Sequence, residues 1–251
     1  MMTAISRELK LGTGIPKLCI PAVGNTEAEF LLNLQAAIAA EPDLIELRID
    51  TLHAADPLPV IRQAVTLARD IPLLLTFRSR RDGGEGSPEK YAELLSRLLD
   101  ENPGFSLIDL EISAGERVFA QLRKKARAQG IPVIGSWHSF SETPDAEQLL
   151  SRFACIERFG ADVAKVAVMP FSSEDVDRLC DCARQARARL QIPLIAISMG
   201  SPGMRTRTEC ESFGSCMTFA SAGTGSAPGQ MPAAAVRAAL QKQHEKLNQK
   251  G

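Results

Sequence analysis

The feature that most constrains the fold is a regular alternation of short apolar segments with longer amphipathic segments. The apolar segments are rich in Val, Ile and Leu, as buried parallel strands are. They span eight ranges: 17–23, 43–50, 72–79, 106–112, 131–140, 161–169, 192–200 and 216–222. The segments with helical periodicity span 26–40, 57–69, 88–101, 115–129, 144–159, 173–190 and 230–249, with a shorter helix over 205–213. Eight strand–helix units in series predict an α/β fold of the closed (β/α)8 type, a TIM barrel.

The length of the chain fits one such barrel. Its 251 residues match the roughly 250 that this fold uses, so we expect a single domain over 1–251. Residues 6–17 precede the first strand and have the pattern of a short hairpin, which we expect to close the bottom of the barrel. The rival architecture is a doubly wound open sheet, which usually has fewer strands and a glycine-rich first turn. Here the first turn reads VGNTEAE.

Composition excludes several classes of partner and site. Twenty-nine basic residues nearly balance thirty acidic ones, so we expect no nucleic acid and no anionic membrane surface as partner. No apolar run approaches the roughly 20 residues that span a bilayer, and Met1 to Lys10 lacks a secretory apolar core. We therefore expect a cytoplasmic protein. Six scattered cysteines and three histidines indicate neither a disulfide framework nor a metal site.

Polar side chains occur on one face of several predicted strands. Because side chains alternate along a strand, parity assigns a set of charged and polar residues to the barrel interior. This interior set includes Glu46, Arg48, Asp50, Arg78, Asp109, Glu111, Ser136, His138 and Lys165. Charged groups inside a barrel are costly unless they pair or bind something. One interpretation is a salt-bridge cluster that only neutralises itself; recurrence over five strands favours an active site at their carboxyl ends.

Lys165 is the most informative residue of this set. It lies in VAKVAVM, with apolar neighbours on both sides. Burial and nearby cations free a lysine amine to attack a carbonyl carbon, which would make Lys165 a nucleophile. His138, at the end of the preceding strand, is suited to transfer protons in both directions. The alternative is a structural lysine paired with Glu46 or Asp109.

Two loops add groups that bind anions. The loop 201–209 follows the seventh strand and offers Arg205 and Arg207. The loop 223–232 follows the eighth strand and offers Ser226 and Gln230. These two loops form the usual anion site of the barrel, for a phosphate or equally for a carboxylate.

Five blocks of the sequence together resemble one known family. The blocks are ELRID (46–50), TFRSRRDGGE (76–85), SWHSF (136–140), ADVAKVAVMP (161–170) and FGSCMTFASAGTGSAPGQ (213–230). In this order and spacing they resemble type I 3-dehydroquinate dehydratase, the Schiff-base class of that enzyme. The resemblance runs from about residue 17 to the last helix and implies a (β/α)8 barrel, in agreement with the strand pattern.

The resemblance also implies roles for individual residues. Lys165 corresponds to the imine-forming lysine and His138 to the general acid–base histidine. The expected substrate contacts are Glu46, Arg48, Arg78, Arg207, Ser226 and Gln230, with Arg207 holding the substrate carboxylate. Arg205 has no counterpart in the family. Where the family commonly has EGG, this chain has DGG, so Asp82 is expected to support His138 with one methylene less, and Asp109 to share that task.

The implied reaction is the dehydration of 3-dehydroquinate to 3-dehydroshikimate in the shikimate pathway, which leads to chorismate and the aromatic amino acids. The imine is the electron sink, so no metal and no organic cofactor is expected, and the family resemblance suggests a homodimer. Two other functions remain open at this point. One is a class I aldolase-type lyase that uses the same lysine, and the other is a catalytically inactive barrel that only binds a ligand.

Overall fold

The computed structural model describes residues 4–6, 9–223 and 229–249. Eight parallel strands form one sheet in the order β10-β3-β4-β5-β6-β7-β8-β9, and all eight match strands expected from the sequence. Their bounds are β3 Lys17–Ala22, β4 Leu44–Arg48, β5 Leu73–Thr76, β6 Leu107–Glu111, β7 Val133–Ser139, β8 Val163–Val168, β9 Leu194–Ser198 and β10 Met217–Phe219.

The sheet curves round so that its two outer strands meet. The amide of Cys216 donates to the carbonyl of Leu194 at 2.8 Å, and the amide of Ala196 donates to Ser215 Oγ at 3.1 Å. These bonds join β9 to the start of β10 and satisfy backbone groups that an open edge would leave unpaired. The result is the (β/α)8 barrel predicted from the sequence, in place of the open sheet.

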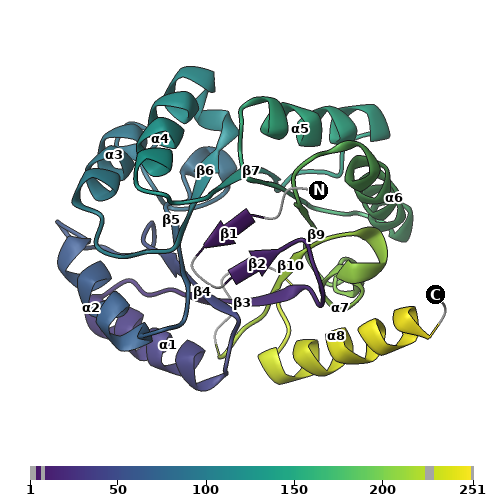
Figure 1. Cartoon of the computed structure of the whole chain (residues 1–251), viewed down its shortest axis with the longest axis horizontal. Coiled ribbons are helices and arrows are strands. Elements are labelled where there is room, and N and C mark those ends of the chain that lie inside the picture. The colour runs from purple at the N-terminus through teal and green to yellow at the C-terminus, as the bar shows by residue number, and fades with distance from the viewer. Residues whose placement is uncertain (1–3, 7–8, 224–228, 250–251) are drawn as a thin grey trace.

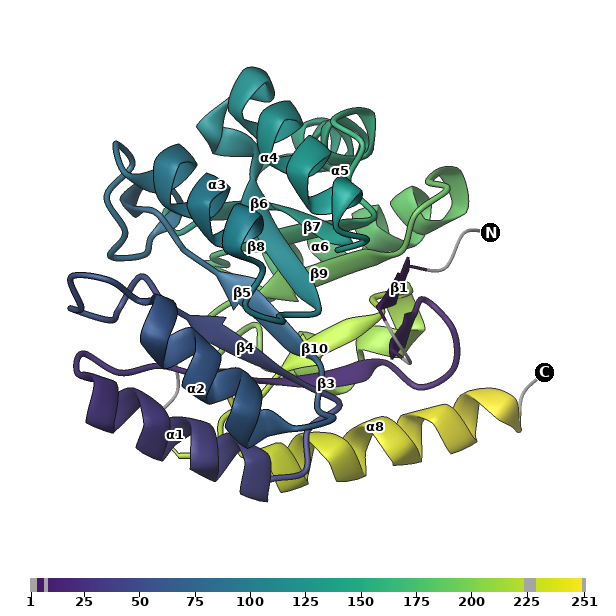
Figure 2. The ribbon, with the colours of Figure 1, turned by 60° about the vertical axis from the view of Figure 1, so that its left-hand side comes forward.

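Helices surround the barrel (Figure 1). Their bounds are α1 Glu27–Ala39, α2 Leu58–Ala68, α3 Tyr91–Glu101, α4 Glu116–Ala128, α5 Ala146–Arg158, α6 Ser173–Arg189, α7 Arg205–Thr208 and α8 Ala233–Asn248. Outward-facing strand residues such as Ile45 and Leu47 pack with helix residues such as Phe30 and Leu34, all fully buried. Turning the molecule by 60° shows α8 continuing the outer layer below β3 (Figure 2). This layer holds each strand in place, which fixes the side chains that point inward.

A hairpin lies across one end of the barrel (Figure 1). It consists of β1 Ala4–Ser6 and β2 Leu9–Leu11, paired antiparallel. Leu9 and Leu11 are buried in one cluster with interior residues at the amino ends of the strands, among them Leu44, Leu107 and Val163. The prediction that a hairpin closes the bottom is therefore confirmed. The predicted range was wrong, because the first strand begins at Ala4 rather than within 6–17.

The barrel interior changes from apolar to polar along each strand. On β4 the inward side chains run from Leu44 to Glu46, and on β8 they run from Val163 to Lys165. The apolar residues fill the end that the hairpin closes. The polar residues therefore gather toward the carboxyl ends of the strands, where this fold places its active sites.

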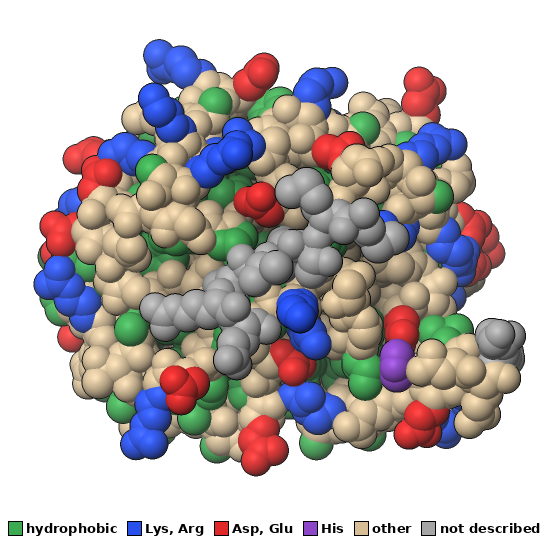
Figure 3. Space-filling view, in the orientation of Figure 1, with side chains coloured by type: hydrophobic (Ala, Val, Ile, Leu, Met, Phe, Trp, Pro, Cys, Tyr) green, Lys and Arg blue, Asp and Glu red, His purple; other side chains and the backbone are tan. Residues whose placement is uncertain are grey.

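Two further findings concern possible partners. Within the described residues, no helix is long and apolar enough to cross a bilayer. In the orientation of Figure 1, acidic and basic side chains are interspersed around the rim of the molecule (Figure 3). This mixture accords with the formal net charge of −1.

Candidate active site

A cavity of about 210 Å³ opens at the carboxyl end of the barrel. Eight of the residues expected at the site line it: Glu46, Arg48, Arg78, Asp82, His138, Lys165, Arg207 and Gln230. Asp109 is buried and contacts the cavity residues Lys165 and Arg78. Ser226 lies outside the described residues. The cavity combines these polar groups with an apolar wall made by Phe140, Ala167, Ile197, Met199 and Phe219.

Lys165 projects from the middle of β8 into this cavity, and its side chain is only 6% exposed. Its Nζ lies 3.3 Å from Asp109 Oδ2 and 4.6 Å from the centre of the Phe219 ring. A carboxylate and the face of an aromatic ring both attract a cation. The surroundings of Lys165 therefore suit a positive charge on its nitrogen, whether an ammonium or a protonated imine.

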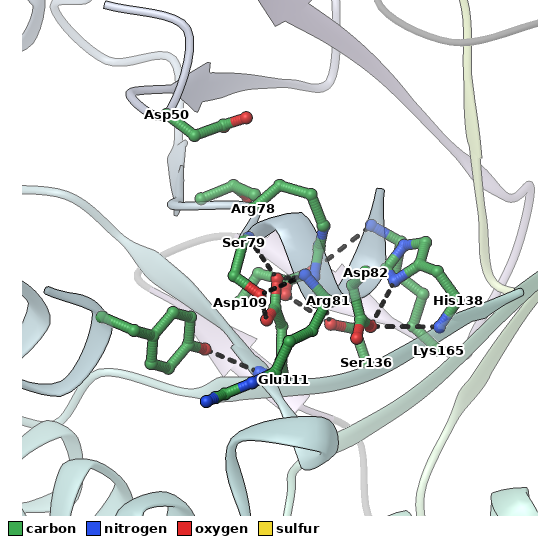
Figure 4. Close-up of polar contacts among 12 residues, drawn as sticks. Asp50, Arg78, Ser79, Arg81, Asp82, Asp109, Glu111, Ser136, His138 and Lys165 are labelled. Atoms are coloured by element: carbon green, nitrogen blue, oxygen red, sulfur yellow. Dashed lines mark hydrogen bonds and ion pairs between the residues drawn. The ribbon is translucent and has the colours of Figure 1, made fainter. Parts of the chain in front are cut away.

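Arg78 links two buried carboxylates of β6. Its Nη2 lies 2.8 Å from Asp109 Oδ2, and its Nη1 lies 3.0 Å from Glu111 Oε1 (Figure 4). Burial alone would raise the pKa of Asp109, but the charges of Arg78 and Lys165 outweigh burial and hold that pKa below its ordinary value. Asp109 is therefore a fixed negative charge beside the lysine.

His138 lies on the strand next to Lys165. In the β7–β8 register Ser136 is opposite Lys165, so His138 is two residues further along and on the same face. Asp82 Oδ2 lies 3.0 Å from His138 Nδ1 and also accepts the His138 backbone amide at 3.1 Å. The contact with Asp82 assigns the ring proton to Nδ1 and leaves Nε2 as the basic atom.

Burial, followed by the positive charges of Arg78 and Lys165, lowers the pKa of His138 well below its ordinary value. The imidazole is therefore neutral near pH 7 and able to accept a proton. Burial also raises the pKa of Asp82. The structure places Asp82 against His138, as expected, while Asp109 contacts Lys165 and Arg78 instead of the histidine ring.

The short loop after β5 presents Asp82. A 3₁₀ turn over Arg80–Asp82 is capped by the Ser79 hydroxyl and ends at Gly83, which has a φ of +78°. Glycine adopts this left-handed conformation without strain. At Gly84 a Cβ would lie 2.2 Å from the carbonyl oxygen of Arg78. The two glycines of the DGG sequence therefore let the loop turn back tightly enough to point Asp82 at His138.

Glu46 and Arg48 extend the polar wall along β4. Arg48 forms two hydrogen bonds with Asp50, at 2.8 and 2.9 Å, and Glu46 accepts from the Thr76 hydroxyl at 2.8 Å. The self-neutralising cluster considered from the sequence is therefore present in part, since Arg78, Asp109 and Lys165 pair with one another. These groups also line or adjoin a cavity, which a purely structural cluster does not require.

The segment after β9 places its two arginines in different surroundings, one buried and one on the surface. It forms α7 and a 3₁₀ turn over Cys210–Phe213, so the expected helix over 205–213 is divided in two. Arg207 is 1% exposed and donates to the carbonyl of Phe219 at 3.3 Å, whereas Arg205 pairs with Asp177 on the surface. Burial lowers the pKa of Arg207 to about 10, so it remains a cation at neutral pH. The two arginines are two residues apart in a helical turn, so their side chains point in different directions.

Three residues at the site were given no role from the sequence. Strand parity assigned Ser136 and Glu111 to the barrel interior but did not indicate their partners. In the structure Ser136 donates to Asp109 and accepts from Arg78, and Glu111 accepts from Arg78. Phe140 stacks near His138 at a centroid distance of 6.4 Å, but an aromatic residue at a strand end carries no such signal. In the described part of the chain, no cluster of His, Cys, Asp and Glu has the arrangement of a metal site.

Comparison with known proteins gives one consistent result. The family model described as type I 3-dehydroquinase matches residues 18–247. The 3-dehydroquinate dehydratase of Albidiferax ferrireducens is 40% identical over 227 residues, which cover 88% of this chain and 86% of that protein.

Solved structures are similar over nearly the whole chain. A type I 3-dehydroquinate dehydratase from Clostridium difficile, solved with covalently modified comenic acid, has a TM-score of 0.92 and 30% identity, covering 98% of this chain and 99% of that one. The 3-dehydroquinate dehydratase from Geobacillus kaustophilus has a TM-score of 0.91 and 35% identity, covering 97% of each chain.

Proposed function

Because the chain belongs to the type I 3-dehydroquinase family and catalyses the dehydration of 3-dehydroquinate to 3-dehydroshikimate, we propose that Lys165 forms the Schiff base and His138 moves the protons. The observation that carries this assignment is the position of Lys165. It is a buried lysine that lines the cavity, on the strand adjacent to the histidine that an aspartate orients.

The first step is attack of the Lys165 amine on the C3 ketone of the substrate. A carbinolamine forms and loses water to give an imine, which is protonated. Asp109 lies beside the reacting nitrogen, and Phe219 presents its ring face to it. Both groups stabilise positive charge there, so they favour the protonated imine that withdraws electrons from C2.

The second step is removal of the C2 proton by Nε2 of neutral His138. The electron pair moves into the imine and gives an enamine. When this electron pair returns from the enamine nitrogen, the C1 hydroxyl is expelled. The hydroxyl takes a proton from His138 and leaves as water. Hydrolysis of the product imine then frees Lys165 and 3-dehydroshikimate. Asp82 keeps the imidazole in the tautomer that this cycle requires and stabilises its charged form.

Arg207 is proposed to hold the substrate carboxylate. It is a buried cation at the cavity wall, and a guanidinium holds a carboxylate by two parallel hydrogen bonds. Glu46, Arg48, Arg78 and Gln230 also line the cavity and are proposed to contact the substrate. Ser226 retains the same proposed role, although it lies outside the described residues.

Family membership decides between the functions that the sequence left open. The relatives and the family model are dehydratases, so the aldolase-type lyase is not favoured. The inactive barrel is also not favoured, since the lysine, the histidine and the buried arginine all line one cavity.

The remaining properties are proposals that follow from the reaction and the composition. The imine supplies the electron sink, so the enzyme is proposed to use no metal and no organic cofactor. We further propose one domain over 1–251, a homodimer, a cytoplasmic location, and no nucleic acid or membrane partner, in keeping with a net charge of −1. Light scattering on the purified protein tests the homodimer directly.

A spectrophotometric assay tests the assignment of Lys165. The product contains a conjugated enone, whose absorbance reports turnover of 3-dehydroquinate. We expect Lys165→Ala to reduce turnover to background. The matched control is Lys125→Ala, since Lys125 pairs with Asp100 on the surface, and its activity should equal that of the unmodified enzyme. Near-normal turnover by Lys165→Ala would show that another group forms the covalent intermediate.

A further inference from the structure

Glu111 is a buried carboxylate on which three hydrogen-bond donors converge. It is 1% exposed and sits at the carboxyl end of β6. Its Oε1 accepts from the Ser79 amide at 2.7 Å and from Arg78 Nη1 at 3.0 Å, and its Oε2 accepts from the Ser79 hydroxyl (Figure 4). Glu111 is absent from the cavity lining, so it takes no part in the chemistry as a reacting group.

One set of contacts leads from Glu111 to the histidine. The Ser79 hydroxyl that donates to Glu111 also accepts from the Arg81 amide. The Ser79 carbonyl accepts from the amides of Asp82 and Gly84, at 3.0 and 2.9 Å. Fixing Ser79 therefore fixes the short turn that carries Asp82. Asp82 in turn holds His138 through both its ring and its backbone amide.

A second set of contacts leads from Glu111 to the lysine. Arg78 lies between Glu111 and Asp109, with one terminal nitrogen on each. Asp109 Oδ2 then contacts Lys165 Nζ at 3.3 Å. Removing Glu111 would leave Arg78 free to shift toward Asp109. This shift would move the Asp109 carboxylate and change the electric field at Lys165 Nζ.

Glu111 is itself held from behind. Its backbone amide donates to the hydroxyl of Tyr91 at 2.7 Å, and Tyr91 is 2% exposed at the start of α3. From these contacts we propose that Glu111 is a positioning residue that sets the places of both catalytic side chains, His138 through Ser79 and Asp82, and Lys165 through Arg78 and Asp109. This inference rests on the roles proposed above for Lys165 and His138.

The contacts require an ionised carboxylate rather than any polar group of that size. Arg78 Nη1, the Ser79 amide and the Ser79 hydroxyl all donate to the Glu111 carboxylate, and a carboxylate only accepts. A glutamine in this place would direct its NH₂ group at a donor. It would also remove the charge that balances Arg78. Glu111→Gln therefore keeps the size of the side chain and removes its negative charge and one of its two acceptor oxygens, on which the proposal depends.

The experiment compares Glu111→Gln, Ser79→Ala and a control on purified enzyme. The control is Asp162→Asn, because Asp162 also caps a strand amide, that of Val133, but does so near the amino end of β7. Borohydride reduction of the enzyme with 3-dehydroshikimate counts the sites that can form the imine, by intact mass. Stopping the reaction with borohydride at successive times gives the rate of imine formation. Turnover is then expressed per competent site.

Dividing turnover by the number of competent sites separates an effect on the position of the catalytic groups from a loss of folded enzyme. A merely structural role would lower the number of competent sites and leave kcat per competent site unchanged. We expect Glu111→Gln to lower kcat per competent site by about 100-fold, the cost of a displacement of about 1 Å at a reacting group, and to slow imine formation. We expect Ser79→Ala to lower kcat per competent site about tenfold, the loss of one hydrogen bond, with imine formation at the normal rate. Asp162→Asn should match the unmodified enzyme.

Three results would overturn the inference. The first is a kcat per competent site within twofold of normal for Glu111→Gln. The second is normal imine formation by that variant, which would remove the connection to Lys165. The third is normal kcat for Ser79→Ala, which would remove the connection to His138. Failure of the proposed function looks different, because the unmodified enzyme would then carry no reduced ligand on Lys165.

Discussion

Replacing Arg207 by lysine keeps the positive charge and removes the planar fork. Arg207 is 1% exposed, and burial has already lowered its pKa to about 10, so water does not screen its contacts and the residue is still charged. The guanidinium also donates to the Phe219 carbonyl at 3.3 Å, which leaves its other N–H groups fixed in direction. A lysine cannot present two parallel donors while keeping that contact.

The expected loss follows from the bond that disappears. A hydrogen bond to a charged group contributes about 1.5–3 kcal/mol, which corresponds to roughly 10- to 150-fold in affinity. Because the carboxylate is held equally in the ground state and the transition state, we expect Arg207→Lys to raise KM by that factor and to leave kcat almost unchanged.

Arg205→Lys is the matched control. Arg205 is two residues away, but its side chain is 40% exposed and pairs with Asp177 on the surface. Exposed pairs contribute about 0–1 kcal/mol to stability, and Arg205 does not line the cavity. Steady-state kinetics of both variants, with circular dichroism to confirm folding, should show kcat/KM within twofold of normal for Arg205→Lys. The reasoning is refuted if Arg205→Lys is the damaging change, or if Arg207→Lys lowers kcat and not affinity.

The remaining predictions concern His138 and its aspartate. His138→Ala should lower kcat by about 10²- to 10⁴-fold yet still form the imine, as mass spectrometry after borohydride reduction would show; a folded variant without adduct would contradict this division of roles. Asp82→Asn should lower kcat at least about tenfold, because a hydrogen bond to a charged group is lost, and unchanged kinetics would exclude Asp82 as the support. An NMR titration of the His138 ring should give a midpoint below pH 6.5, because burial and the charges of Arg78 and Lys165 lower its pKa. The ring should be neutral above that midpoint and charged below it. A midpoint above 6.5 would contradict the assigned environment.

The strands were predictable because their side chains alternate between the helix layer outside and the barrel interior. A strand covered by helices outside and by side chains inside is apolar on alternate positions, so polar residues at the other positions stand out. Asp109 and Glu111 lie between Ile108, Leu110 and Ile112, and all five are buried as parity requires. The sequence left Glu46 and Asp109 as alternative partners of Lys165, because the choice depends on the directions of the side chains inside the barrel. In the structure Asp109 contacts Lys165.

Loops were harder to predict, because their shape depends on contacts distant in sequence. A helix was expected over 205–213, but it is divided into α7 and a 3₁₀ turn, and the sequence did not show which of Arg205 and Arg207 would be buried. The role of Ser79 was not visible either, since its partner Glu111 is 32 residues away. The hairpin was recognised, but its first strand begins at Ala4, where only three residues form the strand. Three residues are too few to show a period.

The most direct test of the central claim is to find which residue carries the substrate. The enzyme is incubated with 3-dehydroquinate, reduced with sodium borohydride, digested and examined by peptide mass spectrometry. Reduction converts the imine into a stable secondary amine. We expect one ligand per chain, on the peptide that contains Lys165, and none in Lys165→Ala. Label on a different lysine, or turnover of 3-dehydroquinate with no label on any lysine, would contradict it.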